Sequence, residues 1–255
     1  MPGAEAAFAR RDTDADWREI GASNPYWGVI SQPQFEKDSL TAEAVEDFYK
    51  TGRDQIDEIA RDLGWLAGRT PSGRALDFGC GLGRLTEAMT RFADPVIGYD
   101  ISPAMLELAR ARGGGVTYVD ELPDGPFDWI NSFIVFQHIP PERGLALLRQ
   151  LMERLSADGM ISLHVTAWRD PRLEPGAAKG VKGLLLALRR WRSARRLPAG
   201  HIHMFDYDLS AVIRILNEAD ILDLRLMSTN HSGHHGVSIL GRKAAPQHSQ
   251  VNRFC

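Results

Sequence analysis

This sequence has few cysteines, no long apolar run and only a small net charge. Only two of the 255 residues are cysteine. Cys80 lies in a glycine-rich segment and Cys255 is the last residue, so a stabilising disulfide is not expected. No stretch reaches the roughly 18 apolar residues that a membrane span needs, and the first residues lack the apolar core of a signal peptide. The formal net charge of -3 gives no overall attraction to nucleic acid. These absences predict a cytoplasmic protein.

The composition is that of an ordinary globular chain, with 44% hydrophobic and 25% charged residues. From residue 75 onward, strand-like and helix-like segments alternate. The expected strands are 75–79, 96–101, 116–120, 127–135, 158–166, 221–229 and 236–243. The expected helices between them are 83–93, 103–112, 141–155 and 209–219. This alternation predicts an α/β fold with a parallel sheet and right-handed crossovers.

The chain divides into three expected parts. Residues 1–68 form an N-terminal helical cap, frayed at its start, in which a helix begins after Thr41 and carries apolar residues at three- and four-residue spacing. Residues 69–245 form the main domain, interrupted by an insert at 167–207 where the alternation stops. Residues 246–255 form a C-terminal tail.

A glycine-rich turn after the first strand predicts a nucleotide-like ligand. The run Leu76–Gly83 leads from a strand into three alternating glycines and then a helix, so that a ligand can lie against bare backbone amides. Asp100 follows 19 residues after Gly81, at the end of the second strand, where an acid can accept hydrogen bonds from ribose hydroxyls. A dinucleotide fingerprint would need glycine where Arg84 stands. Asp77 would also repel a pyrophosphate, but it suits a ligand carrying an ammonium and a sulfonium.

Three motifs together resemble the class I, Rossmann-like, S-adenosylmethionine-dependent methyltransferases of the small-molecule branch. They are the run DFGCGLG at 77–83, the run YDISPAM at 99–105 and the run FDWINSFIVFQHI at 127–139. The likeness covers 70–166 closely and 208–243 by pattern. It implies a three-layer α/β sandwich whose seven-stranded, mostly parallel sheet ends in an antiparallel strand. S-adenosylmethionine is the cofactor that it implies.

The resemblance also implies a set of cofactor-binding residues. Gly79 and Gly81 would contact the methionine portion, Asp100 the ribose, and Ile101 and Met105 the two faces of the adenine. The remaining candidates are Asp77, Cys80, Asp120, Glu121, Leu122, Ser132, Phe133, Trp27 and Arg53. The third-strand motif, VDELP, is shorter than the family's usual one. Arg53 has two interpretations, a partner of the cofactor carboxylate or a surface arginine on an amphipathic helix.

Histidines fall at the carboxyl ends of three expected strands, where ligands bind in parallel sheets. His138 is the first candidate for a catalytic base; the alternative is a histidine that bonds to backbone at a helix start. His164 is expected to be buried and satisfied. The run NHSGHH at 230–235 reads as a polar turn, or as part of a metal site with His201, His203 and Asp206. Its spacing matches no strong metal motif, so no metal is predicted.

The insert carries a basic helical segment, expected to form a lid. Residues 179–196 hold seven Lys and Arg and no acid. Two functional interpretations are recognition of an anionic acceptor and docking on an anionic membrane surface that presents a lipid-linked acceptor. The alternative is a solvated helix whose leucines pack on the domain.

The sequence therefore predicts O-methylation of a small hydroxylated metabolite, such as a sugar, polyketide or glycolipid, by in-line displacement with a histidine base. N- and C-methylation stay open, because the same cofactor half serves all three. The alternatives are an RNA or DNA methyltransferase, a nicotinamide-dependent oxidoreductase and a cofactor-binding module without catalysis. The first lacks the Pro-Pro-aromatic run after Asn131, and Arg84 and Asp77 disfavour the second. The sequence predicts no oligomeric state.

Overall fold

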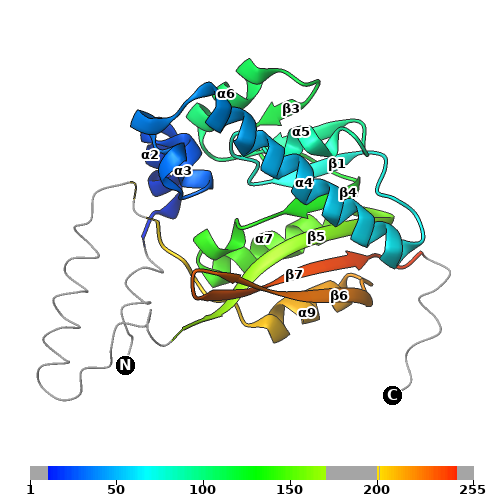
Figure 1. Ribbon diagram of the computed structural model, residues 1–255. Helices are drawn as coiled ribbons and strands as arrows, with labels where there is room; N and C mark the ends of the chain where they lie inside the picture. The colour runs from blue at the N-terminus through cyan, green and yellow to red at the C-terminus, as the bar shows by residue number, and fades with distance from the viewer. Residues whose placement is uncertain (1–10, 171–199, 201, 246–255) are drawn as a thin grey trace, which may run out of the picture.

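The computed structural model describes residues 11–170, 200 and 202–245 (Figure 1). The basic segment 179–196, His201 and the tail 246–255 lie outside the described residues, so the expectations for them are not addressed by the structure. In the described part of the chain, no helix is both long enough and apolar enough to cross a membrane.

A seven-stranded sheet forms the middle layer, with the order β3-β2-β1-β4-β5-β7-β6. Its strands are β1 (Ala75–Phe78), β2 (Val96–Tyr99), β3 (Thr117–Val119), β4 (Phe127–Ser132), β5 (Leu155–Arg169), β6 (Asp223–His231) and β7 (His234–Arg242). The first five strands pair in parallel, and β7 pairs antiparallel with both β5 and β6. The predicted α/β sheet with an antiparallel last strand is confirmed. The chain reverses direction across the sheet between β1 and β4, which places a crevice at their carboxyl ends.

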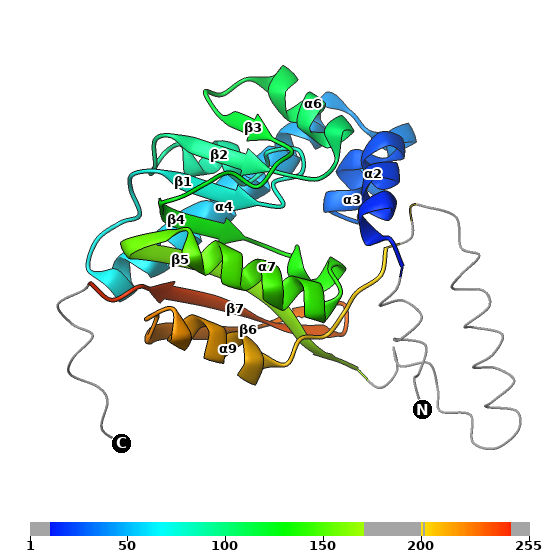
Figure 2. The ribbon, with the colours of Figure 1, turned by 180° about the vertical axis from the view of Figure 1, so that it is seen from behind.

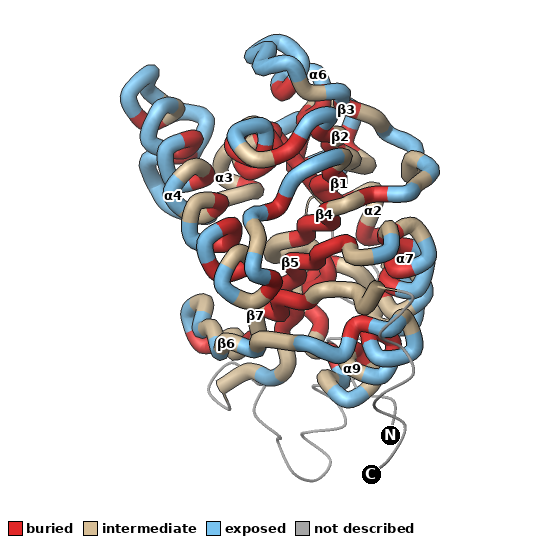
Figure 3. The backbone as a smooth tube through the Cα atoms, turned by 90° about the vertical axis from the view of Figure 1, so that its right-hand side faces the viewer, coloured by how far each residue is buried: buried red, intermediate tan, exposed pale blue. Residues whose placement is uncertain are grey.

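Helices cover both faces of this sheet. The helices α4 (Ala42–Ala67) and α5 (Thr86–Met89) lie on one face, and α7 (Pro141–Glu153) and α9 (Leu209–Glu218) lie on the other (Figures 1 and 2). Neighbouring side chains of β1 point to opposite faces, as strand geometry requires. Ala75 packs in the cluster with α4, whereas Leu76 and Phe78 pack in the cluster with α7 and α9. The buried residues concentrate along the central strands (Figure 3).

The long helix α4 begins and ends as the sequence predicts. The Oγ1 of Thr41 accepts a hydrogen bond from the backbone N–H of Ala44, and Gly68 stops the helix with a φ of 71°. Ile56, Ile59 and Leu63 are its buried stripe against the sheet.

Two predicted elements are shorter than expected. The helix predicted at 83–93 is reduced to α5, because Gly81 and Gly83 have positive φ and keep the chain in a turn up to Leu85. The strand predicted at 127–135 ends at Ser132, because Ile134 has a φ of 58°. A β-branched residue in this left-handed region is strained, and such strain concentrates at functional sites.

The segment expected to form a helical cap contains two helices before α4. They are α2 (Thr13–Ser23) and α3 (Pro25–Val29). The side chain of Asp12 caps α2 by accepting hydrogen bonds from two backbone N–H groups of its first turn. The helix packs on α6 (Pro103–Arg112), where Gly21 lies so close to Ser102 that a Cβ would collide with its Oγ. Both N-terminal helices therefore lie at the carboxyl edge of β1, β2 and β4 (Figure 2).

Candidate active site

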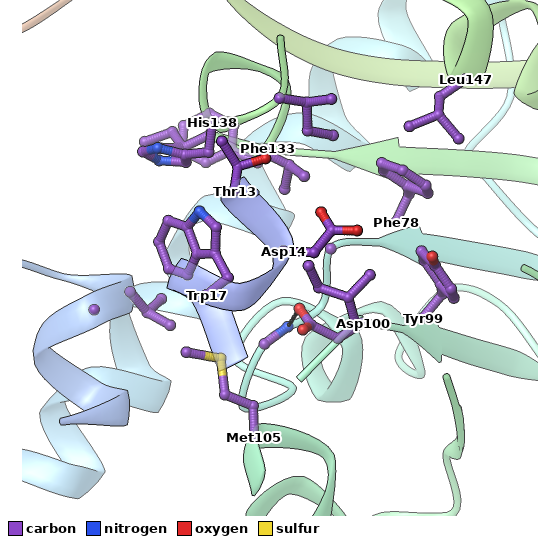
Figure 4. Close-up of a pocket in the computed structure, with 18 of the residues that line it drawn as sticks. Thr13, Asp14, Trp17, Phe78, Tyr99, Asp100, Met105, Phe133, His138 and Leu147 are labelled. Carbon is purple, nitrogen blue, oxygen red and sulfur yellow. Dashed lines mark hydrogen bonds between the residues drawn. The ribbon is translucent and has the colours of Figure 1, made fainter. Parts of the chain in front are cut away.

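A cavity lies between the carboxyl ends of β1, β2 and β4 and the helix α2 (Figure 4). It encloses about 900 Å³ of atom-free space, its open mouth included. The predicted site residues that line it are Gly79, Gly81, Asp100, Ile101, Met105, Phe133 and His138. The fold thus brings together seven residues from five separate segments.

The glycine turn presents bare backbone to this cavity. The φ angles of Gly79 and Gly81 are 76° and 53°. The turn is held on β2, because the backbone N–H groups of Gly79 and Cys80 both donate to the carbonyl of Tyr99, at 2.8 and 2.9 Å. A Cβ at position 81 would lie 3.3 Å from Val29 and 3.6 Å from the sulfur of Met105. The absence of a side chain here keeps a gap between the turn and the apolar groups opposite.

Asp100 is the acid at the end of β2. Its carboxylate accepts hydrogen bonds from the backbone N–H groups of Gly81 and Ser102, both at 2.8 Å. Burial raises the pKa of this carboxyl to about 6, an increase that its two backbone hydrogen bonds partly oppose. Each carboxylate oxygen retains a further lone-pair position, because a carboxylate offers about four such positions in all. Asp100 can therefore accept a pair of hydroxyl hydrogens from a molecule in the cavity.

Asp77 lies behind the turn and does not line the cavity. Its two carboxylate oxygens accept hydrogen bonds from the Oγ1 of Thr86 at 2.6 Å and the Nδ2 of Asn131 at 2.7 Å. Burial raises the pKa of Asp77, while these two bonds lower it. The Oδ1 of Asn131 accepts in turn from Ser162. This chain of hydrogen bonds ties the start of α5 to β1, β4 and β5, so Asp77 supports the glycine turn from below.

Several other predicted residues lie away from the cavity lining. Cys80 is buried beside Leu106 and Tyr118, and Ser132 is buried at the end of β4. The three candidates after β3, namely Asp120, Glu121 and Leu122, do not line the cavity, and neither does Trp27. Leu122 packs against the core cluster instead.

Arg53 also lies outside the cavity, on the solvent-facing side of α4. Its guanidinium pairs with Glu46 at 2.6 Å, and 40% of its side chain is exposed. The interpretation of Arg53 as a surface arginine agrees with this placement.

His138 faces the cavity from a short 3-10 turn, η3 (Phe136–His138), after β4. Its Nδ1 lies 3.0 Å from the carbonyl oxygen of His203, and because a carbonyl only accepts, Nδ1 carries the hydrogen. Its Nε2 is therefore a lone-pair acceptor, which the Nε2 of Gln137 approaches at 3.3 Å. Burial lowers the pKa of His138 to about 4, so the imidazole is neutral at pH 7.

Two other histidines, His164 and His231, lie beside Phe133 and do not line the cavity. The rings of His164 and His231 are 5.2 and 6.4 Å from the Phe133 ring, centroid to centroid. His164 is fully buried, as predicted, and its Nε2 lies 2.8 Å from the Oγ1 of Thr229. Its Nδ1 has no hydrogen-bond partner among the described residues, so only one of its two ring nitrogens is satisfied. Burial lowers its pKa to about 3, and it also lowers the pKa of His231 and His234. Within the described residues, no group of three or more His, Cys, Asp or Glu could hold a metal ion.

Helix α2 supplies cavity residues that sequence reasoning missed. Thr13, Asp14 and Trp17 project from it toward the space shared with Asp100 and His138 (Figure 4). Two hydrogen bonds of 2.8 and 2.7 Å join Asp14 to Arg143 at the start of α7. The Trp17 ring meets the ring of His138 edge-on at 4.6 Å. The acidic run after Asp12 signals a helix start, but no local pattern indicates where that helix packs.

Comparison with known families decides the class of this fold. The family profile described as a methyltransferase domain matches residues 50–220, about two thirds of the chain. The chain belongs to this methyltransferase family. S-adenosylmethionine is the methyl donor that the family uses.

Similar sequences to this methyltransferase carry the names of small-molecule enzymes. It is 35% identical over 124 residues to the trans-aconitate 2-methyltransferase of Rhizobium rhizogenes, covering 46% of this chain and 48% of that one. It is 37% identical over 145 residues to the ubiquinone biosynthesis O-methyltransferase of Alkalilimnicola ehrlichii, covering 52% and 56%. The methyltransferase thus spans about half the length of the curated relatives it matches.

Solved structures share the methyltransferase fold at low sequence identity. Magnesium protoporphyrin IX methyltransferase from Synechocystis PCC 6803, with bound S-adenosylhomocysteine, superposes with a TM-score of 0.58 at 17% identity, over 91% of this chain and all of that one. The amino pentose methyltransferase CalS10 from Micromonospora echinaspora superposes with a TM-score of 0.53 at 17% identity, over 80% and 98%.

Proposed function

We propose that this protein transfers the methyl group of S-adenosylmethionine to a hydroxyl of a small molecule. The observation that carries the proposal is the hydrogen bond from the backbone N–H of Gly81 to the carboxylate of Asp100. It places a glycine turn without side chains beside an acid at the edge of one cavity. The family match supports the donor, and the names of the relatives support a small acceptor. A nucleic-acid substrate and a nicotinamide cofactor have no comparable support.

The residues of the cavity fit the cofactor on three counts. A side chain at position 81 would narrow the gap to Val29 and Met105, the carboxylate of Asp100 has lone pairs for ribose hydroxyls, and Ile101 and Met105 offer apolar surfaces for adenine. Gly79 and Gly81 would hold the methionine portion against their backbone, with Phe133 beside it. Asp77 acts indirectly, by fixing the turn through Thr86.

His138 would receive the proton of the acceptor hydroxyl. When bound, the cofactor would supply a methyl group on a sulfonium. An acceptor lone pair would form a bond to the methyl carbon in line with the carbon–sulfur bond, which breaks and releases the neutral thioether. The hydrogen bond from Nδ1 to His203 leaves a lone pair on the Nε2 of His138, and burial keeps this nitrogen unprotonated at neutral pH. The acceptor hydroxyl would displace the amide of Gln137, whose Nε2 lies 3.3 Å from this nitrogen. Trp17 covers the imidazole, which excludes water from the same space. An anionic or lipid-linked acceptor, bound by the segment 179–196, stays a prediction.

Calorimetric titration tests the proposal directly. The protein is expected to bind S-adenosylhomocysteine with micromolar or better affinity and to show no heat with NADH. Incubation with methyl-labelled S-adenosylmethionine and a panel of phenols, sugars and amines then identifies the acceptor atom by mass spectrometry. Binding of NADH in place of S-adenosylhomocysteine would refute the proposal, and label only on nitrogen would refute the hydroxyl acceptor.

A further inference from the structure

A partly buried arginine that forms no ion pair with the described residues lies at the edge of the cavity. Arg84 follows the glycine turn directly and lines the cavity with Gly79 and Gly81. Among the described residues, no carboxylate lies within ion-pair distance of its guanidinium. Its terminal nitrogens donate to neutral groups of α4, the Oγ1 of Thr51 at 3.1 Å and the Oε1 of Gln55 at 3.0 Å. Its Nε is buried and has no hydrogen-bond partner.

The nearest acid does not neutralise this charge. Asp77 interacts with Arg84 only through space, since both of its oxygens accept hydrogen bonds from Thr86 and Asn131. Burial lowers the pKa of Arg84 to about 10, so the guanidinium still carries its charge at pH 7. A charge that is largely removed from water and has no counter-ion is costly, so an anion placed beside this guanidinium would lower that cost.

The position of Arg84 is also fixed. The helix α4 passes so close that a Cβ on Gly52 would collide with the Arg84 carbonyl oxygen and approach its side chain. With Thr51 and Gln55 each accepting one hydrogen bond from it, the guanidinium is a pre-positioned donor, and the second N–H of each terminal nitrogen is left for an anion.

We propose that Arg84 binds the carboxylate of the amino-acid portion of S-adenosylmethionine. The inference rests on the proposed function. The carboxylate is the one anionic group of that molecule, and the turn at 79–81, which would hold the amino-acid portion, ends three residues before Arg84. Asp100, which would bind the ribose of the same molecule, accepts a hydrogen bond from the backbone N–H of Gly81 in this turn. Arg84 thus takes the role that the sequence suggested for Arg53.

A ligand that lacks only the carboxylate separates this role from a structural one. S-adenosyl-3-thiopropylamine keeps the nucleoside, the thioether and the amine of S-adenosylhomocysteine. We expect the wild type to prefer S-adenosylhomocysteine by about 10- to 100-fold, the value of a charge-assisted hydrogen-bonded pair. Arg84→Gln should remove most of this preference by weakening only S-adenosylhomocysteine. Arg91→Gln is the matched control. Arg91 also contacts α4, but it pairs with Asp57 at the surface, so this variant should keep the preference.

Each result of these calorimetric titrations decides the inference. Equal loss of both ligands in Arg84→Gln would mean a structural role, and a preference that vanishes in Arg53→Gln instead would return the role to Arg53. If Arg84→Gln does not fold, the wild type alone must still show the preference, and equal affinities there would overturn the inference while the proposed function stands. Failure of the wild type to bind S-adenosylhomocysteine would overturn the proposed function and the inference together.

Discussion

Protonation of Asp100 should weaken cofactor binding in a pH range where few other groups of the site titrate. The pKa of this carboxyl is raised to about 6 by burial, and the carboxylate form is the one that accepts two hydrogen bonds from a ribose. If only this form binds, the affinity for S-adenosylhomocysteine is nearly constant from pH 7 upward and falls about tenfold between pH 7 and pH 5. The α-amino and α-carboxyl groups of the ligand titrate outside this interval.

The matching substitution is Asp100→Asn. In asparagine, an N–H₂ group replaces one of the two carboxylate oxygens that accept from the backbone N–H groups of Gly81 and Ser102. One of these two hydrogen bonds is therefore lost, and one ribose hydroxyl meets a donor in place of an acceptor. We expect the affinity at pH 7 to fall by about 2–3 kcal/mol, the value of one charge-assisted bond and its desolvated partner. The remaining affinity should not change between pH 5 and pH 7.

Isothermal titration calorimetry at half-unit pH steps measures both effects, and a thermal scan at each pH confirms that the protein is folded. Asp124→Asn, which removes a fully exposed carboxylate, is the control and should reproduce the wild-type pH curve. Two results would refute the reasoning: a wild-type affinity that is the same at pH 5 and pH 7, or a pH dependence that survives in Asp100→Asn.

Three further predictions concern the base, the N-terminal helix and the buried histidines. His138→Ala should keep the affinity for S-adenosylhomocysteine within about twofold and lower turnover by about 100-fold or more; unchanged turnover would remove His138 from the mechanism. Gly21→Ala should push α2 off α6, because its Cβ would collide with Ser102 and lie 3.0 Å from Met105. The affinity for S-adenosylhomocysteine should fall tenfold for each ~1.4 kcal/mol needed to displace the helix. The control Ala22→Ser, on the exposed side of α2, should bind S-adenosylhomocysteine with wild-type affinity. The pKa values of His138 and His164 are lowered to about 4 and about 3, so the unfolded state binds more protons below pH 6.5, and stability is complete above that pH and lost as the pH falls toward 4. Urea unfolding should therefore show a loss of about 2 kcal/mol per histidine at pH 5, partly offset by Asp100, whose raised pKa stabilises the fold as this carboxyl takes up a proton. A flat profile would contradict the burial of the two histidines as neutral groups.

The sheet and the nucleotide turn could be predicted because their signals are local. The apolar strand 127–132, the glycines at 79–83 and the acid at 100 each report a backbone requirement of their own segment. The shape of the sheet then follows from general rules of parallel strands. Asp100 was predicted in this way, whereas Met105 was predicted from the family resemblance.

The residues that were missed depend on contacts between distant segments. Nothing near Asp14 in the sequence indicates that it reaches Arg143, which is 129 positions away. Arg53 and Arg84 look alike as single arginines, and only the packing of α4 on the glycine turn places Arg84 at the cavity and leaves Arg53 outside it, paired with Glu46. His138 was found from its place after a strand, but the neutral tautomer that its bond to His203 imposes needs the tertiary structure.

One wall of the cavity comes from outside the range that identifies the family. The family match begins at residue 50, whereas Thr13, Asp14, Trp17 and Val29 all line the space beside the glycine turn. A shortened chain beginning at the matched range would keep β1 to β5 and still be recognised as a methyltransferase domain. Its cofactor groove would nevertheless open to solvent on one side. In this protein, family membership is encoded in the sheet, whereas enclosure of the reaction space depends on some twenty residues that precede it.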